Sequence, residues 1–474
     1  MNYLRLVALC ATLLLVTIGP LLSSGWAAAS HQPQPPNFVV ILTDDQSWVG
    51  SSLLMDPLDP RTRSDYYQTP SIERLADMGM RFTQGFAPAP YCCPTRRSFQ
   101  IGQTPARHIY QKDQSNWTKV YRKRLTLPRM LKQANPNYRT AHFGKWDFRF
   151  DEVSPEEMGY DVSDGKTGNG TGGGRGKGGP AAKEDPKLVF GITKRASDFM
   201  EQAATSGNPF FVQVSHYAVH LDIFYKQSTL DASTDWKPGK KHTMPEFAAM
   251  TSDVDTAIGQ LLDKIKSLGL SDNTYIFFMS DNGGRLTMPG QKGEQLPRNH
   301  PLRGGKGSMY EGGLRVPFIV VGPSIQAGGV SRVAVSGLDL FPTIAELAGY
   351  NSQLPTLLDG GSIIEVLQNQ GRGTVSRQHP FLLFHQAVAR TAQTAIIQGD
   401  YKLVKTWRED RLELFDLSRS VSEAKDLSKS NPEKTKELHT LMVEFLADVG
   451  AETRKTTTKA KRKKEYQRNR SSGT

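Results

Sequence analysis

The stretch NFVVILTDDQ, residues 37–46, joins a short apolar run to a pair of aspartates. A short apolar run that is rich in β-branched residues predicts a buried β-strand. Similar runs stand at 140–143 (TAHF), 209–214 (PFFVQV), 274–279 (TYIFFM) and 316–321 (VPFIVV). Ahead of the TYIFFM run, apolar residues recur at helical spacing over 254–268, and Gly269 follows where a helix would end. Strands that alternate with amphipathic helices predict an α/β fold, with a large, mostly parallel sheet flanked by helices.

The pattern changes near residue 375. Short strand-like runs at 395–397, 401–404 and 412–417 surround a turn at Gly399-Asp400 and predict an antiparallel meander. A helix is predicted after them, with Asn431 as its cap and Pro432 in its first position. We therefore expect a larger domain over 30–375 and a smaller C-terminal α+β domain over 376–453.

The two ends of the chain differ in composition from the middle. Residues 1–29 place Arg5 before an apolar stretch and end in three alanines, which predicts a cleaved signal peptide, with an uncleaved anchor helix as the alternative. Residues 454–474 hold nine Lys/Arg against one Glu, so this tail carries most of the net charge of +12. We expect a disordered tail that either attracts polyanions or has no partner. Nucleic acid ranks last among those polyanions, because an exported protein rarely meets it.

Composition excludes several classes of protein. Hydrophobic residues make up 38% of the chain, enough for a large core, so a mainly disordered chain is excluded. Three cysteines are too few for a disulfide scaffold. No apolar run after residue 30 reaches transmembrane length, so a multi-pass membrane protein is excluded as well. We expect an exported protein, either periplasmic or secreted.

The glycine-rich segment 164–180 lacks a preceding strand, which favours a surface loop over a nucleotide site.

Polar residues follow two of the predicted strands. Asp44 and Asp45 end the first strand, and Asp281 and Asn282 end the TYIFFM strand. Open α/β sheets place ligands at the carboxyl ends of their strands, so these side chains would converge if the two strands are neighbours. Three carboxylates and an amide oxygen would suit Ca²⁺ or Mg²⁺ better than Zn²⁺. Either pair alone would also fit an ordinary turn.

The run Cys92-Cys93-Pro94-Thr95-Arg96 matches the C-x-P-x-R signature of sulfatases. Further stretches follow in the order of that family: Thr43-Asp44-Asp45-Gln46, Gly144-Lys145-Trp146, Ser280-Asp281-Asn282-Gly283, Gly304-Gly305-Lys306-Gly307 and Tyr310-Glu311-Gly312-Gly313-Leu314-Arg315-Val316-Pro317. The chain therefore resembles the formylglycine-dependent (type I) sulfatases of the alkaline-phosphatase-like superfamily.

The resemblance implies a set of roles. A formylglycine-generating (sulfatase-modifying) enzyme would oxidise Cys92, and the hydrated aldehyde would attack sulfur. The cation, Ca²⁺ by family with Mg²⁺ as the alternative, would be bound by Asp44, Asp45, Cys92, Asp281 and Asn282. Arg96 would orient the nucleophile, Lys145 and Lys306 would hold sulfate oxygens, and His220 would protonate the leaving oxygen. His216 is expected to be a structural, hydrogen-bonding histidine, and Cys93 a small buried residue.

Two departures from the family pattern affect the expected activity. Asp147 stands where the family has a histidine after Gly-Lys-Trp, and Ile101-Gly102-Gln103 replaces a common Thr-Gly-Arg. Asp147 is expected to act as a base, to lie outside direct contact with substrate, or to mark reduced activity. The predicted function is hydrolysis of a sulfate ester, on a carbohydrate or polysaccharide. The alternatives are a phosphonate or phosphate monoester hydrolase and a non-catalytic binder of sulfated glycans.

Overall fold

A computed structural model describes residues 34–108, 122–148, 153–172, 184–387 and 392–452. The predicted signal peptide and basic tail lie outside these ranges, as do residues 173–180 of the glycine-rich segment. The described residues from Pro35 onward belong to one compact unit, so the boundary between 375 and 376 stays a prediction. Among the described helices, none combines the length and the apolar character needed to span a bilayer.

The main sheet has eight strands in the spatial order β5-β4-β6-β1-β7-β8-β2-β9. Its central strand β1 pairs in parallel with β6 on one side and with β7 on the other. The only antiparallel pairings among these described strands are those of β8 with β7 and with β2. The mostly parallel sheet is thus confirmed. Its strands are β1 (Asn37–Thr43), β2 (Met80–Phe82), β4 (Arg139–Gly144), β5 (Val162–Ser163), β6 (Phe210–Ser215), β7 (Thr274–Ser280), β8 (Phe318–Val321) and β9 (Gly329–Ser331).

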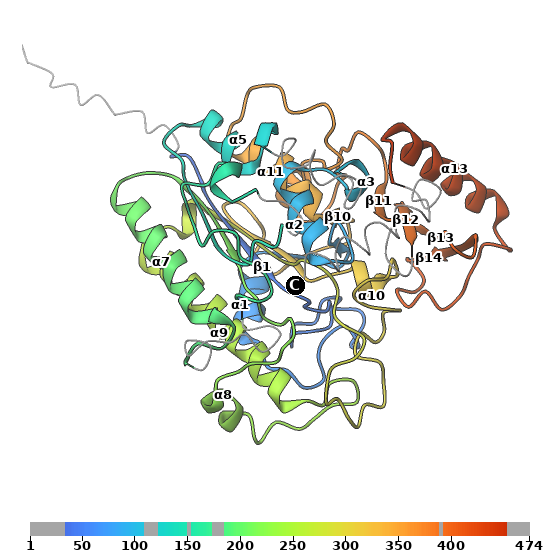
Figure 1. Ribbon diagram of the computed structural model, residues 1–474, viewed down its shortest axis with the longest axis horizontal. Helices are drawn as coiled ribbons and strands as arrows, with labels where there is room; N and C mark the ends of the chain where they lie inside the picture. The colour runs from blue at the N-terminus through green and yellow to red at the C-terminus, as the bar shows by residue number, and fades with distance from the viewer. Residues whose placement is uncertain (1–33, 109–121, 149–152, 173–183, 388–391, 453–474) are drawn as a thin grey trace, which may run out of the picture. The chain divides into compact units, whose positions relative to one another are not determined.

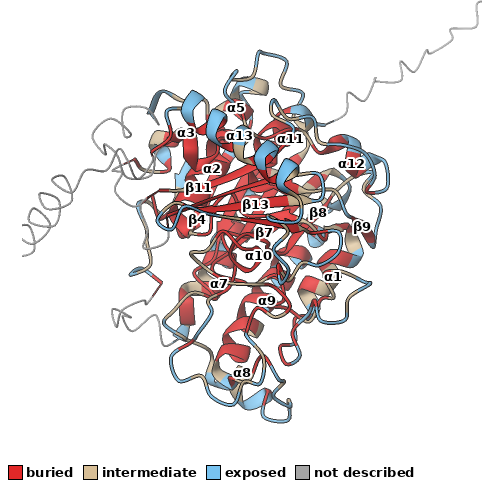
Figure 2. Ribbon diagram, turned by 90° about the vertical axis from the view of Figure 1, so that its right-hand side faces the viewer, coloured by how far each residue is buried: buried red, intermediate tan, exposed pale blue. Residues whose placement is uncertain are grey.

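Helices cover both faces of this sheet (Figure 1). Successive side chains of a strand point to opposite faces, and β1 alternates accordingly. Phe38, Val40 and Leu42 join the core under α2, α5 and α11, whereas Val39 and Ile41 join the core under α1, α7 and α9. Figure 2 shows the buried residues concentrated in the strands and on the inner sides of these helices. The longer helices are α1 (Pro70–Met78), α2 (Cys92–Ile101), α5 (Leu127–Ala134), α7 (Val189–Thr205), α9 (Pro245–Ser267) and α11 (Leu340–Leu347).

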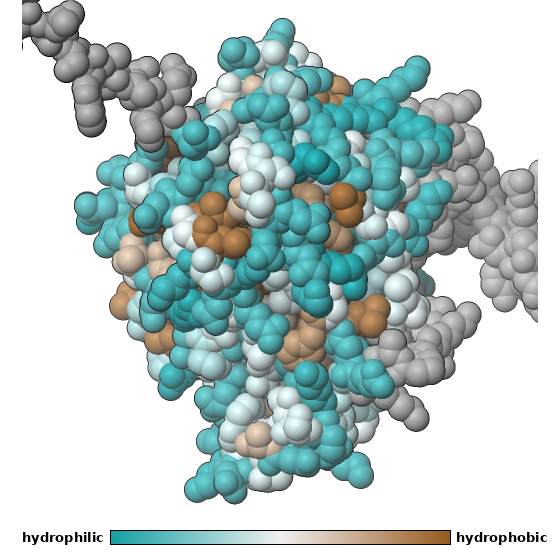
Figure 3. All heavy atoms as spheres, turned by 90° about the vertical axis from the view of Figure 1, so that its left-hand side faces the viewer, coloured by the Kyte–Doolittle hydropathy of each residue, from teal (hydrophilic) through white to brown (hydrophobic). Residues whose placement is uncertain are grey.

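Short elements complete this part of the fold. They are α3 (Pro105–His108), α8 (Gln227–Ala232), α10 (Glu311–Leu314), α12 (Ile364–Gln368) and the paired strands β3 (Gly85–Phe86) and β10 (Val335–Ser336). The predicted helix over 254–268 is the second half of α9, and Gly269 follows it with a φ of 68°. Glycine adopts this left-handed conformation without a steric cost, which explains the end of the helix there. The surface in Figure 3 is largely hydrophilic, with apolar residues in small separate groups.

A second sheet of four antiparallel strands follows near the C-terminus. Its strands are β11 (Leu382–Gln386), β12 (Gln393–Gln398), β13 (Tyr401–Thr406) and β14 (Arg411–Asp416), with α13 (Pro432–Asp448) after them. The expected meander and helix are confirmed, and the Asn431 side chain accepts a hydrogen bond from the Lys434 amide at 3.3 Å. The strand β11 is an addition to the prediction. The sheet packs on the first part of the chain through Phe86 and Leu314.

Candidate functional site

The acidic pairs predicted at two strand ends lie side by side. Because β1 and β7 pair in parallel register, Asp44 and Asp45 meet Asp281 and Asn282 at one edge of the sheet. Asn282 Nδ2 donates to Asp45 Oδ1 at 2.8 Å, and the Asp45 amide donates to Asp281 Oδ1 at 3.2 Å. All four residues are at most 3% exposed. The convergence expected from the sequence therefore occurs, in a water-poor environment.

Helix α2 brings the cysteine to this edge. Cys92 is the first residue of α2, and Pro94 lies in the first turn as predicted. The Cys92 Sγ lies 3.5 Å from Asp44 Oδ1 and 3.3 Å from Lys306 Nζ. Burial raises the pKa of the Cys92 thiol, and the charges of Asp281 and Asp44 raise it further. This environment disfavours the thiolate form of an unmodified Cys92, and the thiolate is the nucleophilic form of cysteine.

Three cations bind the carboxylates of the site. Lys145 Nζ lies 2.5 Å from Asp44 Oδ2, and Lys306 Nζ lies 2.5 Å from Asp45 Oδ1. Arg96 Nη2 lies 2.7 Å from Asp281 Oδ2. Arg96 Nη1 also donates to the Lys145 carbonyl at 2.6 Å, which ties α2 to the end of β4. Each cation thus has a carboxylate partner that holds it beside Cys92.

These ion pairs decide the protonation of the aspartates. Burial alone would raise the pKa of Asp44, but the charges of Lys145, His220 and Arg96 outweigh it and hold that pKa well below its usual range. Burial raises the pKa of Asp281 to about 6, with the charge of Asp44 acting in the same direction. For Lys145, burial acts to lower the pKa, yet the charge of Asp44 raises it well above its usual value. Asp44 and Lys145 are therefore both ionised at neutral pH.

The donor set fits a hard divalent cation. Ligand atoms of Asp44, Asp45, Cys92 and His220 all lie within 4.8 Å of one another. Asp45 Oδ2 and Asn282 Oδ1 are buried, and neither has a hydrogen-bond partner in the described part of the chain. Leaving such oxygens unsatisfied is costly, and oxygen atoms are the ligands that Ca²⁺ and Mg²⁺ prefer. Asp281 is not one of these four residues, and its oxygens accept hydrogen bonds from Arg96 and from the Asp45 amide.

Asp147 lies in the site although it replaces the usual histidine. Its Oδ2 is 3.4 Å from Lys145 Nζ, and the residue is 4% exposed. Asp45 and Asp147 have positive φ angles of 60° and 51°. Aspartate and asparagine tolerate this left-handed region better than other side chains. The carboxylate of Asp147 therefore faces the same lysine that binds Asp44.

The two predicted histidines differ in their surroundings. His220 Nε2 lies 3.8 Å from Asp45 Oδ2, while its Nδ1 lies 2.6 Å from the Leu221 carbonyl. Because a carbonyl oxygen only accepts, Nδ1 carries the proton and Nε2 faces the site. His216 is fully buried, but its ring nitrogens have no hydrogen-bond partner among the described residues, which differs from the hydrogen-bonded histidine we expected.

Lys187 is a residue near the site that the sequence patterns missed. Its ammonium lies 5.3 Å from the centre of the Phe224 ring, and the residue is 2% exposed. Burial lowers the pKa of Lys187 to about 8, partly offset by the charges of Asp44 and Asp222. Lys187 lies outside every sequence motif, in the run Asp185-Pro186-Lys187-Leu188 that leads into α7. A positive φ of 61° turns the backbone here, and no sequence signal marks that turn.

Comparisons with known proteins identify relatives of the chain. A family model described as Sulfatase matches residues 36–350, and one described as N-sulphoglucosamine sulphohydrolase, C-terminal, matches residues 305–451. A protein named Sulfatase from Formosa agariphila is 27% identical over 88% of both chains. The N-acetylgalactosamine-6-sulfatase of Mus musculus is 27% identical, over 72% of this chain and 67% of the relative. The crystal structure of Ps i-CgsB in complex with k-i-k-neocarrahexaose is similar with a TM-score of 0.71 at 24% identity, covering 87% of this chain and 93% of that one.

Proposed function

Because the chain belongs to the sulfatase family, whose members hydrolyse sulfate esters, we propose that it removes sulfate from a sulfated carbohydrate with residue 92 as its nucleophile. The observation that carries the proposal is the place of Cys92. Its Sγ lies between Asp44 Oδ1 at 3.5 Å and Lys306 Nζ at 3.3 Å. A nucleophile between a cation site and a lysine is suited to attack on an anionic ester.

The proposal includes a modified residue and a cation. Asp44, Asp45, Asp281, Asn282 and residue 92 would hold Ca²⁺, with Mg²⁺ as the alternative. Formylglycine at position 92 would supply a hydrated aldehyde as the nucleophile, and the cation would stabilise charge on it. The unpartnered oxygens of Asp45 and Asn282 support this assignment.

The remaining side chains act on the substrate and on residue 92. Lys145 and Lys306, both adjacent to Cys92 and its aspartates, would bind sulfate oxygens and offset charge that develops in the transition state. Arg96, fixed by Asp281 and the Lys145 carbonyl, would orient residue 92. With Nδ1 protonated against the Leu221 carbonyl, Nε2 is the nitrogen that faces the site, and His220 would give a proton to the leaving alcohol oxygen from Nε2 when the ring is in its doubly protonated, cationic form. Asp147 would take a proton from residue 92 when sulfate leaves.

The relatives and the composition support the wider proposal. One relative is an N-acetylgalactosamine-6-sulfatase, and one similar structure contains a neocarrahexaose, so we propose a sulfated saccharide as substrate. The chain would be exported to the periplasm or secreted after a modifying enzyme has acted on Cys92. The basic tail, outside the described residues, would attract polyanions such as the substrate itself.

The mass of the tryptic peptide that contains Cys92 tests the proposal. We would express the chain with a formylglycine-generating enzyme and expect a loss of about 18 Da, the change from a thiol to an aldehyde side chain. The matched controls are Cys93→Ala, which should keep the shift, and Cys92→Ala, which should abolish both the shift and sulfate release. A Cys92 that stays unmodified in a host that modifies a known sulfatase would refute the mechanism.

The same preparation separates the rival functions. An enzyme that hydrolyses an aryl phosphate faster than the matching aryl sulfate would be a phosphate or phosphonate ester hydrolase. A protein that binds sulfated glycans without releasing sulfate, and whose Cys92 stays a thiol, would be a glycan binder. Asp147, in place of the usual histidine, is the observation that favours this last outcome.

A further inference from the structure

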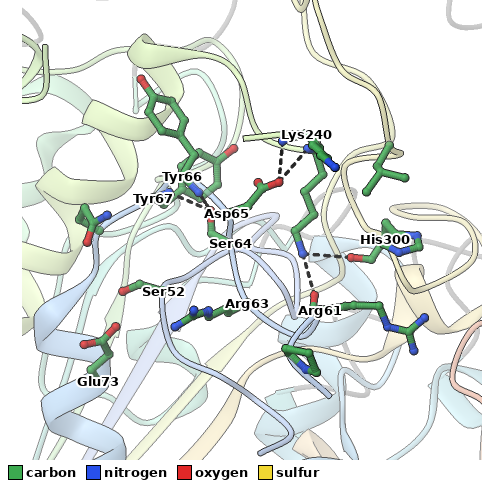
Figure 4. A pocket seen from close by; sticks show the side chains of 14 residues that line it. Ser52, Arg61, Arg63, Ser64, Asp65, Tyr66, Tyr67, Glu73, Lys240 and His300 are labelled. Atoms are coloured by element: carbon green, nitrogen blue, oxygen red, sulfur yellow. Dashed lines mark hydrogen bonds between the residues drawn. The ribbon is translucent and has the colours of Figure 1, made fainter. Parts of the chain in front are cut away.

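A cavity of about 640 Å³ lies among the loops that follow β1 and α8 and the loop ahead of Lys306 (Figure 4). Its walls include Arg61, Arg63, Lys240, Lys241 and His300. Ligand cavities for small molecules have volumes of roughly 300–1,000 Å³, so this one is large enough for a sugar residue. No motif of the sequence points to it, and none of the proposed catalytic residues lines it.

Tyr67 lies between this cavity and the surroundings of the proposed catalytic centre. It lines the large cavity and also a narrow one of about 10 Å³, whose walls include Asp45. The Tyr67 ring stacks on His242 at a centroid distance of 4.4 Å, and its hydroxyl accepts a hydrogen bond from Arg298 Nη2 at 3.2 Å. Tyr67 is 1% exposed. This rigid side chain is therefore a shared wall between the large cavity and the surroundings of Asp45.

Arg298 adds positive charge behind that wall. The residue is 5% exposed, and its guanidinium carbon lies 4.6 Å from the centre of the Phe247 ring. Its Nη1 has no hydrogen-bond partner in the described part of the chain. A buried guanidinium without a carboxylate is costly unless an anion approaches it. The narrow cavity thus has an unsatisfied donor next to a metal-ligand candidate.

The walls of the large cavity contain four cationic side chains, Arg61, Arg63, Lys240 and Lys241, against the two carboxylates of Asp65 and Glu73. Lys241 Nζ donates to the carbonyls of Arg61 and His300 at 2.7 and 3.2 Å, so it is fixed in the wall. Burial lowers the pKa of Lys241 to about 8, partly offset by the charge of Asp65. The Asp65 carboxylate accepts hydrogen bonds from the amides of Lys240 and Lys241, at 2.7 and 3.0 Å.

Two cations of the wall remain available. Arg61 is paired with Asp59 at 2.7 Å. By contrast, the side chains of Arg63 and Lys240 form no salt bridge with any described carboxylate. Both residues are exposed, so an oxyanion in the cavity can reach them. Arginine and lysine in a concave polar site are the side chains that bind sulfate and carboxylate groups.

We propose that this cavity binds an anionic sugar residue, bearing a sulfate ester or a carboxylate, of the same saccharide whose scissile sulfate lies at residue 92. This inference rests on the proposed function and adds to that function the class of substrate. Arg63 and Lys240 bind the oxyanion of that sugar, and Tyr67 separates it from the residue that undergoes reaction. The enzyme then prefers an oligosaccharide with more than one anionic group over a small monosulfate.

The test compares a small substrate with a long one. Arg63→Ala, Lys240→Ala and the double variant are assayed on 4-nitrophenyl sulfate and on chondroitin, keratan, heparan and carrageenan hexasaccharides. Lys237→Ala is the matched control, since Lys237 is an exposed lysine of the same loop that does not line the cavity. We expect each single variant to lower kcat/KM on the preferred hexasaccharide about 3- to 10-fold more than on the aryl sulfate, through KM. Added salt should reduce this difference.

A binding assay makes the proposal independent of turnover. Cys92→Ala, with and without Arg63→Ala and Lys240→Ala, is titrated with the same hexasaccharides, and the added substitutions should raise Kd about tenfold. Desulfated and carboxyl-reduced forms of the bound hexasaccharide show which oxyanion the cavity binds. The proposal is overturned if no hexasaccharide binds, or if the double variant behaves like Lys237→Ala. Failure of the proposed function appears separately, as an unmodified Cys92 with no aryl sulfate hydrolysis.

Discussion

Replacing Lys402 with methionine should destabilise the fold in a pH-dependent way. Lys402 Nζ lies 2.7 Å from Glu311 Oε1 and 2.9 Å from Glu423 Oε1, and all three side chains are 0% exposed. Arg315 completes this buried network, with its Nε 2.5 Å from Glu311 Oε2. Glu311 opens the short helix that follows the Lys306 loop. The network therefore attaches that loop to β13.

The magnitude follows from the charges left behind. Lys402→Met leaves two carboxylates against one guanidinium in a buried site, and breaking such a network costs about 3–5 kcal/mol. With an unfolding entropy of about 2 cal/mol/K per residue over roughly 390 described residues, Tm should fall by roughly 5 °C. Lys405→Met is the matched control, because Lys405 lies on the same strand and pairs with Asp410, whose side chain is 89% exposed. That change should cost less than about 1 kcal/mol.

The pH dependence of this stability loss identifies Glu423 as the group that causes it. Burial raises the pKa of Glu423 to about 7, against the lowering effect of Lys402. Without Lys402 that pKa rises further, so folded Glu423 keeps its proton at pH 8, whereas unfolded Glu423 is ionised. Stability of the variant then falls with pH above 7, where that of the native protein does not, and the difference grows by about 1.4 kcal/mol per pH unit.

Thermal and urea unfolding of both variants at pH 5.5 and pH 8 provide the measurement. The double variant Lys402→Met with Glu423→Gln should recover part of the loss at pH 8, since glutamine is neutral in both the folded and the unfolded chain and takes up no proton on folding. Equal losses for Lys402→Met and Lys405→Met, or a loss independent of pH, would refute the reasoning.

Four further predictions concern the proposed catalytic centre and helix α13. Lys306→Ala should lower kcat for an aryl sulfate by about 10²–10³, because it removes a cation beside residue 92; a change confined to KM would contradict this. Asp147→Asn should lower kcat at least about tenfold without altering the 18 Da mass shift of the Cys92 peptide, read by kinetics and mass spectrometry. Removing metal with a chelator should abolish activity and lower Tm, and Ca²⁺ at about 100 times its Kd should restore about 2.7 kcal/mol of stability. Asn431→Ala should cost about 1 kcal/mol in urea unfolding, through loss of the α13 cap, with activity retained.

The sequence predicted those parts of the fold that have a strong local pattern. The strands β1, β6 and β7 are covered on both faces, so each is a continuous apolar run that stands out against its neighbours. The strands β2 and β9 have three residues each, too few for any period. Tertiary pairing alone makes them strands, and no local signal was available to find them.

The residues of the site also divide into those that lie in a sequence motif and could be predicted and those that lie in loops without a pattern. Asp44, Cys92 and Lys306 lie in motifs, so their convergence could be expected from family resemblance and from the rule that ligands lie at strand ends. Lys187 and Arg298 lie in loops without a recognisable pattern. Their positions depend on how distant loops pack against one another, which is information that only the folded chain contains.

The central place of β1 also sets the order of events during synthesis. Of the two strands that bear the proposed metal ligands, one ends before Asp44 and the other before Asp281, which lies 237 positions later in the sequence, so the sheet edge cannot close until the second strand has been made. Cys92, only 2% exposed once folded, is accessible to an enzyme during that time. At about 5–20 residues per second, the roughly 190 residues from Cys92 to Asp281 take roughly 10–40 s. The modification that we propose for residue 92 would therefore compete with folding of the chain, and slower translation would raise the modified fraction.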